Sequence, residues 1–198
     1  MNIFVLDENP VKSAQAMDCV RVPKMVTESA QMMASALRRH GATDEQMPLT
    51  KAGRPYLGGY KNHPCTIWAG DNRANFNWLA RHAQALLTEY NKRFGKVHAC
   101  HNPIYQMLCM SEMIPEGDLT PFALAMPDDF RPHLNEHIGA PFDVVPNDDF
   151  TFISHASGDD AVQAYRRYYH SKADSKGGVH YRHTNPPDWW EIPEVIGV

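Results

Sequence analysis

Residues 73–94 form an amphipathic pattern that constrains the fold more than any other feature of the chain. Asp71 can cap the start of a helix here, and Gly95 is the kind of residue that commonly ends one. We therefore predict a central helix over 73–94 that buries Trp78 and Leu86. Its apolar side chains recur at helical spacing, at Trp78, Leu79, Ala83, Leu86, Leu87 and Tyr90.

Further helix signals lie on both sides of this segment. A turn at 7–10 predicts a helix from about residue 11, and Pro23 should break or kink it, because proline lacks the amide hydrogen that a continuing helix needs. A second helix should follow over 24–40, and a third amphipathic segment covers 159–171. These signals predict a mainly α protein.

The other segments are predicted to be connections. The apolar run 3–6 is either a buried strand or a first packed turn. Glycines and prolines over 41–64 predict an irregular connection, in which residues 58–59 suit a hairpin turn. Residues 101–158 are proline-rich and acidic, with short helical pieces at most, and the aromatic residues of 186–190 predict a strap packed on the surface.

Length and composition predict one compact helical domain over 1–198 with long irregular connections. Its helical core spans about 10–95 and 159–172, and the acidic connection spans about 101–158. Hydrophobic residues make up 43% and charged residues 21%, which excludes a disordered chain. We find neither a signal peptide nor a membrane span, so we expect a cytoplasmic protein, in a cell or an infected host cell, with its four cysteines as thiols.

The net charge of −4 is unevenly distributed along the chain. Residues 112–149 hold nine acids against the single base Arg131, so the remaining residues carry a net charge of +4. A basic face and an acidic lobe can coexist in one molecule. Nucleic acid is therefore neither required nor excluded as a partner.

A carboxylate beside the core is the first candidate for chemistry. Glu28 lies at helical spacing from the apolar Met25 and Met32, and Lys24 and Gln31 are its neighbours on the same helix edge. This edge offers a cation, an acid or base, and an amide to a small polar pocket. An ordinary Lys–Glu pair at the core boundary would explain the same spacing and is favoured by spacing alone.

Histidines and cysteines suggest two metal sites, both of which the sequence disfavours. Residues 133–137 match the HxxEH pattern of some zinc peptidases, but little amphipathic helix surrounds them. A second set has irregular spacing and is better explained as surface and boundary residues: His63, Cys65, His98, Cys100 and His101. We expect no protein-bound metal set.

Basic side chains gather in two segments. Arg81, Lys92, Arg93 and Lys96 lie on the central helix, whereas Arg166, Arg167 and Lys172 are interleaved with Tyr165, Tyr168 and Tyr169. Such mixing suits phosphate contact with base stacking, and solvated helix faces with core tyrosines explain it equally well. Loops and signatures typical of common nucleotide-binding enzymes are not found.

Several stretches resemble a phage-encoded family whose members are similar to amino-acid:DNA transferases and other thymine-hypermodifying proteins. The stretches are MNIFVLDENP, KMVTESAQMMASAL, NHPCTIW, NFNWLARHAQALLTEYNKRFGKVH and LTPFALAMPDDF. Members carry a Cys-Asp-Lys-His run seven residues before the glutamate that corresponds to Glu28. Here Arg21 stands at the histidine position, with Asp18 and Cys19 before it. A histidine-dependent step therefore does not carry over, and an arginine suits an anionic leaving group or a DNA phosphate.

The resemblance implies an enzyme that acts on a flipped-out DNA base. The first hypothesis is replacement of the pyrophosphate of an activated 5-hydroxymethylpyrimidine by an amino acid or another amine. Glu28 would serve as the base, Arg21 and Lys24 would bind the departing pyrophosphate, and Mg²⁺ is a possible cofactor. Residues expected to contact substrate or DNA are Gln31, Asn75, Trp78, Tyr165, Arg166, Arg167, Tyr169 and Lys172.

Two alternatives stay open. The phage pyrimidine-dimer DNA glycosylase is similar in its His-to-Glu spacing, and its Trp-Tyr-x-Tyr-Tyr-Gly-Lys end resembles 165–172 here. That glycosylase and lyase uses a free amino-terminal amine as nucleophile, exposed by removal of the initiator methionine, and Asn2 does not normally permit this removal. The glycosylase is therefore the second hypothesis, and a non-catalytic DNA-binding or host-takeover protein is the third.

Overall fold

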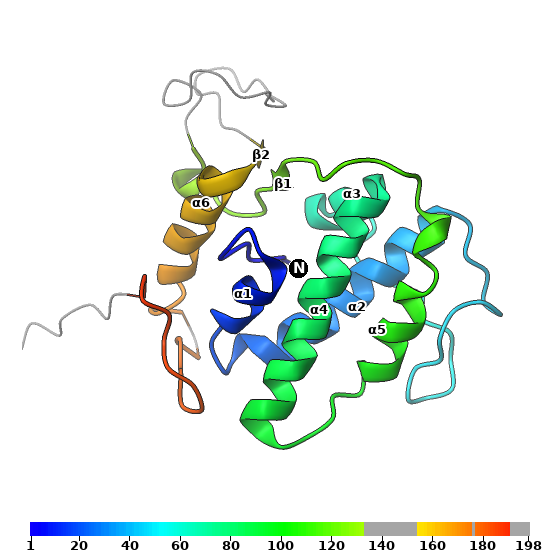
Figure 1. Ribbon diagram of the computed structural model, residues 1–198, viewed down its shortest axis with the longest axis horizontal. Helices are drawn as coiled ribbons and strands as arrows, with labels where there is room; N and C mark the ends of the chain where they lie inside the picture. Colours follow the sequence, from blue (N-terminus) through cyan, green and yellow to red (C-terminus); the bar gives the residue numbers. More distant parts are fainter. Residues whose placement is uncertain (133–153, 176, 191–198) are drawn as a thin grey trace, which may run out of the picture.

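The computed structural model describes residues 1–132, 154–175 and 177–190. Within these ranges the chain forms six α-helices and one pair of short strands. This confirms the predicted mainly α fold, in which four of the other five helices gather around the long helix α4 (Figure 1). The helices are α1 (Pro10–Gln15), α2 (Arg21–Arg39), α3 (Pro64–Asp71), α4 (Arg73–Phe94), α5 (His101–Leu108) and α6 (Gly158–His170).

Helix α4 packs against α1, α2, α3 and α5. It buries Trp78 and Leu86, as predicted for a central helix over 73–94. Gly95 ends it in the left-handed conformation, with φ at 64°. The cap was predicted one residue too early: Asn72 caps the helix through its side-chain oxygen, because Asp71 is the last residue of α3.

Helix α2 includes Pro23, so the predicted break at this residue is wrong. The first helix stops at Gln15, and the chain turns through 16–20 before α2 begins. Pro23 is the third residue of α2, where an amide hydrogen would have no acceptor within the helix, so the proline ring is tolerated. The methionine face predicted for this helix is buried, with Met25 and Met32 fully inaccessible.

The connection between α2 and α3 is irregular, as predicted, but its turn lies elsewhere. An isolated bridge pairs Leu49 with Pro55 instead of centring a hairpin on residues 58–59. Gly58 lies directly against α2, where an added Cβ would come within 2.2 Å of Ser35 Oγ. Close backbone packing, and not a hairpin turn, is the reason for a glycine at this position.

Helix α3 has no counterpart in the sequence-based expectations. His63 caps it by accepting a hydrogen bond from the Cys65 amide, and Pro64 occupies the first turn. At its far end, Asp71 forms an ion pair of 2.9 Å with Arg39 of α2. The helix therefore fixes the end of the 41–63 connection against α2.

The opening run 3–6 is buried but belongs to neither a strand nor a helix. Phe4 has a φ of 40°, and its ring contacts three tyrosine rings of α6. Ser13 of α1 holds the run in place, since its hydroxyl donates to Phe4 O and accepts from the Leu6 amide. The start of the chain thus lies inside the molecule, between α1 and α4 in Figure 1.

Short elements link α5 to α6. The described part contains two 3₁₀ turns, Ser111–Met113 and Asp128–Phe130, and the antiparallel strands β1 (Phe122–Ala123) and β2 (His155–Ala156). The 3₁₀ turns agree with the prediction of short helical pieces at most over 101–158, whereas the two short strands were not predicted. Helix α6 matches the amphipathic segment predicted over 159–171, and it buries Tyr165 and Tyr169, which were expected to contact DNA.

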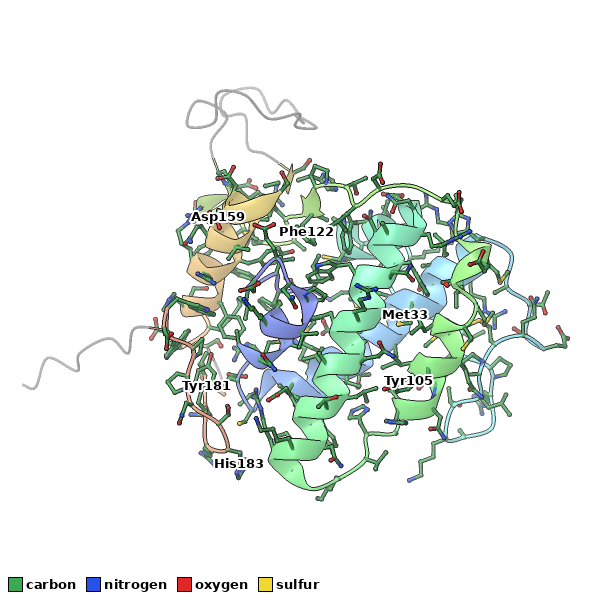
Figure 2. The ribbon with its side chains drawn as sticks, viewed as in Figure 1. Met33, Tyr105, Phe122, Asp159, Tyr181 and His183 are labelled. Atoms are coloured by element: carbon green, nitrogen blue, oxygen red, sulfur yellow. The ribbon has the colours of Figure 1, made fainter. Side chains whose placement is uncertain are left out.

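Residues 177–190, here called the strap, run back along α6 and include the aromatic residues 186–190 that were predicted to pack on the surface. The Trp190 ring stacks on His170 at 4.5 Å between centroids. Tyr181, labelled in Figure 2, donates a hydrogen bond to Ala16 O. All four cysteines are free thiols, as predicted. None of the helices in the described ranges is long and apolar enough to cross a membrane.

Candidate functional site

Glu28 lies on α2 at the edge of the core, as its spacing predicted. Only 13% of its side chain is exposed, and it faces two amino groups. Its Oε1 lies 3.4 Å from Lys24 Nζ, and its Oε2 lies 3.7 Å from the Met1 amino nitrogen. Oε2 is buried and has no hydrogen-bond partner among the described residues, so the Met1 amine is the group it faces.

The amine reaches this position because the first residues are fixed. The Asn2 side chain accepts hydrogen bonds of 2.8 Å from the amides of Ile3 and Phe4 and donates one of 2.7 Å to Ala125 O. The Met1 side chain itself is fully buried. An apolar, hydrogen-bonded chain start therefore holds the amine against the carboxylate, with the preorganisation that a reactive group needs.

The segment that enters α3 forms a second wall of this site. Burial lowers the pKa of His63, and the nearby Met1 amine lowers it further, while Glu28 opposes both effects. Burial raises the pKa of Cys65 to about 12, so this thiol is protonated and is a poor nucleophile at neutral pH. The site thus combines one amine, one carboxylate and a largely neutral imidazole.

Lys24 and Gln31 remain beside Glu28, as predicted, on the same edge of α2. The Lys24 side chain is 65% exposed and can contact a ligand. Gln31 lies under the 58–59 backbone, where a Cβ on Gly59 would be 3.7 Å from its side-chain carbon. The predicted stripe therefore borders the pair formed by the amine and the carboxylate.

Arg21 is occupied elsewhere. Its guanidinium pairs with the buried Asp18 at 2.5 Å, donates to Gly178 O at 2.9 Å and lies over the Tyr169 ring. Asp18 also accepts a hydrogen bond from the His180 amide, so the pair fastens the strap to α2. Among the described residues no hydrogen bond or ion pair joins Arg21 to Glu28. The contacts that Arg21 makes are structural, because they join α2 to the strap.

Two predicted DNA-facing residues, Asn75 and Trp78, lie in the core. The Asn75 amide group donates to Trp68 O and Thr120 Oγ1, which ties α4 to α3 and to the chain before β1. Trp78 is 5% exposed, and its indole nitrogen donates to Glu8 O. In this conformation neither side chain offers a face on which a DNA base can stack.

Two predicted tyrosines of α6 are also internal. Tyr165 donates a hydrogen bond to Ala123 O, and Tyr169 accepts one from the Asp18 amide. Burial raises the pKa of both phenols well above its ordinary value, and both rings are fully buried. The third tyrosine of α6, Tyr168, is only partly buried. Lys172 Nζ lies over its ring, 3.8 Å from the centroid.

The three predicted phosphate ligands near α6, here called the α6 cations, are Arg166, Arg167 and Lys172. Arg166 donates to Leu6 O and lies over the Trp189 ring, and burial lowers its pKa. Arg167 is exposed and donates to Phe130 O. On α4, Arg93 is buried in an ion pair with Glu89 and is not a surface cation.

Metal ligation gets no support from the side chains that the structure describes. No group of three or more histidine, cysteine, aspartate or glutamate side chains is gathered there in a way that could hold a metal ion. The sequence pattern at 133–137 lies outside the described residues. We therefore derive no chemical step through a metal.

Sequence reasoning identified Glu28 and missed its partner. An amino-terminal nucleophile was considered but tied to removal of the initiator methionine, whereas the Met1 amine itself meets Glu28. His63 was assigned only to an improbable metal set, although it adjoins this pair. No sequence pattern indicated this contact, because the position of the amine depends on the hydrogen bond from Asn2 to Ala125 O, far along the chain.

Comparison with known proteins finds one matching family. Residues 1–102 match the sequence model of a family described as pyrimidine dimer DNA glycosylase. The matched region contains Met1, Lys24, Glu28 and His63, and it ends early in α5. No curated protein and no solved structure matches the chain.

Proposed function

The chain belongs to the pyrimidine dimer DNA glycosylase family, and we propose that it is a DNA glycosylase and lyase whose nucleophile is the Met1 amine and whose acid–base group is Glu28. The single observation that carries the proposal is the 3.7 Å approach of the Met1 nitrogen to Glu28 Oε2 in a largely buried site. A nucleophile within reach of a base is the arrangement that covalent catalysis requires. Pyrimidine-dimer DNA is the substrate we propose.

The chemistry follows from these two groups. The Met1 nitrogen forms a bond to C1′ of the deoxyribose, and the bond from C1′ to the base breaks with its electron pair on the base, which takes a proton from solvent. Glu28 accepts the proton that the nitrogen releases. The bond between C1′ and the ring oxygen then breaks, Glu28 returns its proton to that oxygen, and the nitrogen and C1′ form a protonated imine. Glu28 takes a proton from C2′, and the bond between C3′ and the 3′ phosphate oxygen breaks with its electron pair on the phosphate, which cleaves the strand.

The contact between Met1 and Glu28 supports a mechanism to which Asn2 is no obstacle. Removal of the initiator methionine is not needed, because the amine of Met1 already lies against the carboxylate. Asn2 has a structural role, because its side chain donates a hydrogen bond to Ala125 O and so holds the first residues in place. The proposal requires that residue 1 carry an unblocked amine, which an intact-mass measurement checks.

The transferase hypothesis gains no support from the comparisons. It assigned pyrophosphate to Arg21 and Lys24, and Arg21 is paired with Asp18 and bound to the strap. The glycosylase hypothesis, second on sequence alone, is therefore the one we favour. Transfer of an amine to a modified pyrimidine, an origin in a phage-infected cell and a purely DNA-binding role stay predictions.

Covalent trapping tests the proposal. The protein is incubated with a duplex that contains one cyclobutane pyrimidine dimer, in the presence and absence of borohydride, and the products are digested and analysed by mass spectrometry. We expect strand cleavage without borohydride and, with it, a DNA adduct on the peptide that contains Met1. An adduct on Lys24 would overturn the assigned nucleophile, and binding without cleavage or adduct would overturn glycosylase action.

A further inference from the structure

The loop over residues 57–63 is anchored to α2 at two points. Arg38 donates hydrogen bonds of 3.2 and 3.1 Å to Tyr56 O, just before the loop. The Ser35 hydroxyl donates to Gly59 O at 3.0 Å and accepts from the Gly59 amide at 2.8 Å. Gly58 permits this approach, because any Cβ there would collide with Ser35. The base of the loop is therefore fixed, although its tip projects into solvent.

The tip carries an exposed aromatic residue in a rare backbone conformation. Tyr60 has a φ of 52° and is 70% exposed, and the neighbouring Leu57 is 75% exposed. Residues other than glycine seldom adopt a positive φ, and such strain persists only where the surrounding structure imposes it. Burial of the side chain does not explain this strain, because the phenol ring is presented to solvent.

A positively charged pocket adjoins the tip. It has a volume of about 550 Å³ and is lined by Arg38, Arg39 and Lys61 together with Leu57 and Thr66. The two arginines are partly neutralised by ion pairs with Asp44 and Asp71. Lys61 makes no ion pair or hydrogen bond with the residues that the structure places, so its charge is free for an anion.

The same loop ends at the proposed active site. Gly59 lies beside Gln31, which follows Glu28 by three residues and therefore lies on the same edge of α2. His63 closes the loop, and its pKa responds to both the Met1 amine and Glu28. The exposed Tyr60 is thus three residues from His63, which adjoins the Met1–Glu28 pair, and its carbonyl oxygen accepts a hydrogen bond from the His63 amide.

We infer that Tyr60 stacks on a base next to the reacting nucleotide while Lys61 binds an adjacent phosphate, so that the 57–63 loop holds the duplex open. This inference rests on the proposed function. A base attacked at its sugar must leave the helix stack, and an aromatic ring can take up the stacking that its neighbour loses. Every base offers a flat face, so this contact needs no sequence preference. A fixed loop base avoids the entropic cost of ordering the contact on binding.

The test uses the full-length protein and a duplex with a pyrimidine dimer beside 2-aminopurine, whose fluorescence rises when it loses a stacking partner. The variants are Tyr60→Gly, Tyr60→Phe and Lys61→Gln. Tyr105→Ala on α5 is the matched control, because that tyrosine is also exposed at the surface. Dissociation constants, salt dependence, fluorescence and thermal unfolding are measured for each.

Tyr60→Gly is the most informative change. Glycine adopts a positive φ without strain, so the variant should unfold at the same temperature as the wild type or higher. Its affinity for the damaged duplex should nevertheless fall about tenfold or more, the scale of one lost aromatic–base stack. Tyr60→Phe should keep both properties, Tyr105→Ala should keep the affinity, and Lys61→Gln should reduce the salt dependence by about one phosphate contact.

The outcomes separate this inference from the glycosylase proposal. Unchanged affinity and unchanged 2-aminopurine fluorescence in Tyr60→Gly would overturn the loop's role, even if the wild type forms the Met1 adduct. Conversely, if the wild type forms no adduct but Tyr60→Gly still lowers the affinity for DNA, only the catalytic proposal would be overturned. An equal loss in Tyr105→Ala would also count against the loop, because it would show a general sensitivity to removal of surface tyrosines.

Discussion

Replacing Glu28 by glutamine tests the centre of the proposed mechanism. The change preserves the size of the side chain and much of its hydrogen bonding but removes the negative charge and the proton acceptor. If Glu28 accepts a proton during the reaction, turnover should fall by about a hundredfold or more, the scale of general acid–base assistance. Affinity for DNA should not fall, because the change removes a negative charge and leaves Lys24 and Tyr60 in place.

The effect on stability can be bounded from the geometry. At 3.7 Å, the attraction between the Met1 amine and Glu28 is about 4–5 kcal/mol for an effective dielectric constant of about 20, before desolvation is counted. Desolvation of both groups offsets most of this attraction. The pair with the exposed Lys24 adds less than about 1 kcal/mol. We expect the free energy of unfolding to fall by about 1–3 kcal/mol, which leaves a folded protein.

Single-turnover cleavage and borohydride trapping, with denaturant unfolding of the same preparation, provide the assay. Glu112→Gln is the control, because it makes the same chemical change at a glutamate that is 81% exposed and paired with Arg73. That variant should keep its turnover and its stability. A folded Glu28→Gln protein with wild-type turnover would refute the assigned role of Glu28.

Four further outcomes are expected. Charge-neutral replacement of the α6 cations should flatten the salt dependence of DNA affinity if they bind phosphates, and an unchanged slope would place the DNA surface elsewhere. Burial lowers the pKa of His82 to about 3. As pH falls from about 6.5 toward 3, His82 is therefore protonated in the unfolded state but not in the folded state. The free energy of unfolding should fall by about 1.4 kcal/mol per pH unit over this range because of this group. In His82→Leu that component should be missing from denaturant titrations across this range. Gly58→Ala should lower the free energy of unfolding by about 1–3 kcal/mol, measured the same way, because the methyl group collides with Ser35 and the residue has a positive φ. Asp18→Asn should cost about 3–5 kcal/mol by leaving Arg21 without its buried partner, and a change below 1 kcal/mol would show that the pair is dispensable.

The long helices were predictable because each leaves a periodic apolar face. The patterns at 24–40, 73–94 and 159–171 all correspond to helices of the structure. Helix α3 left no such signal, since it is short and buries residues around most of its circumference, including Cys65 and Trp68. Periodicity identifies a helix only when one side of it faces water.

The candidate site was predictable only in part, for a similar physical reason. Glu28 could be found because a charged residue between buried methionines is unusual. The main-chain amine of Met1 is not marked by any residue type in the sequence. Its position depends on the hydrogen bond from Asn2 to Ala125 O, far along the chain. Aromatic residues were ambiguous for another reason, because Trp78, Tyr165 and Tyr169 fill a core as readily as they stack on a base.

The burial of the chain start has a practical consequence for anyone who produces this protein. An affinity tag fused ahead of Met1 would turn its amine into an amide, which carries no positive charge and cannot attack a sugar. The fusion would also have to leave a position where the Met1 side chain is fully enclosed. If Met1 is the nucleophile, as proposed, a tagged preparation would bind DNA and still be inactive in every cleavage assay. Recombinant protein should therefore carry its tag at the other end or release it without leaving a residue behind.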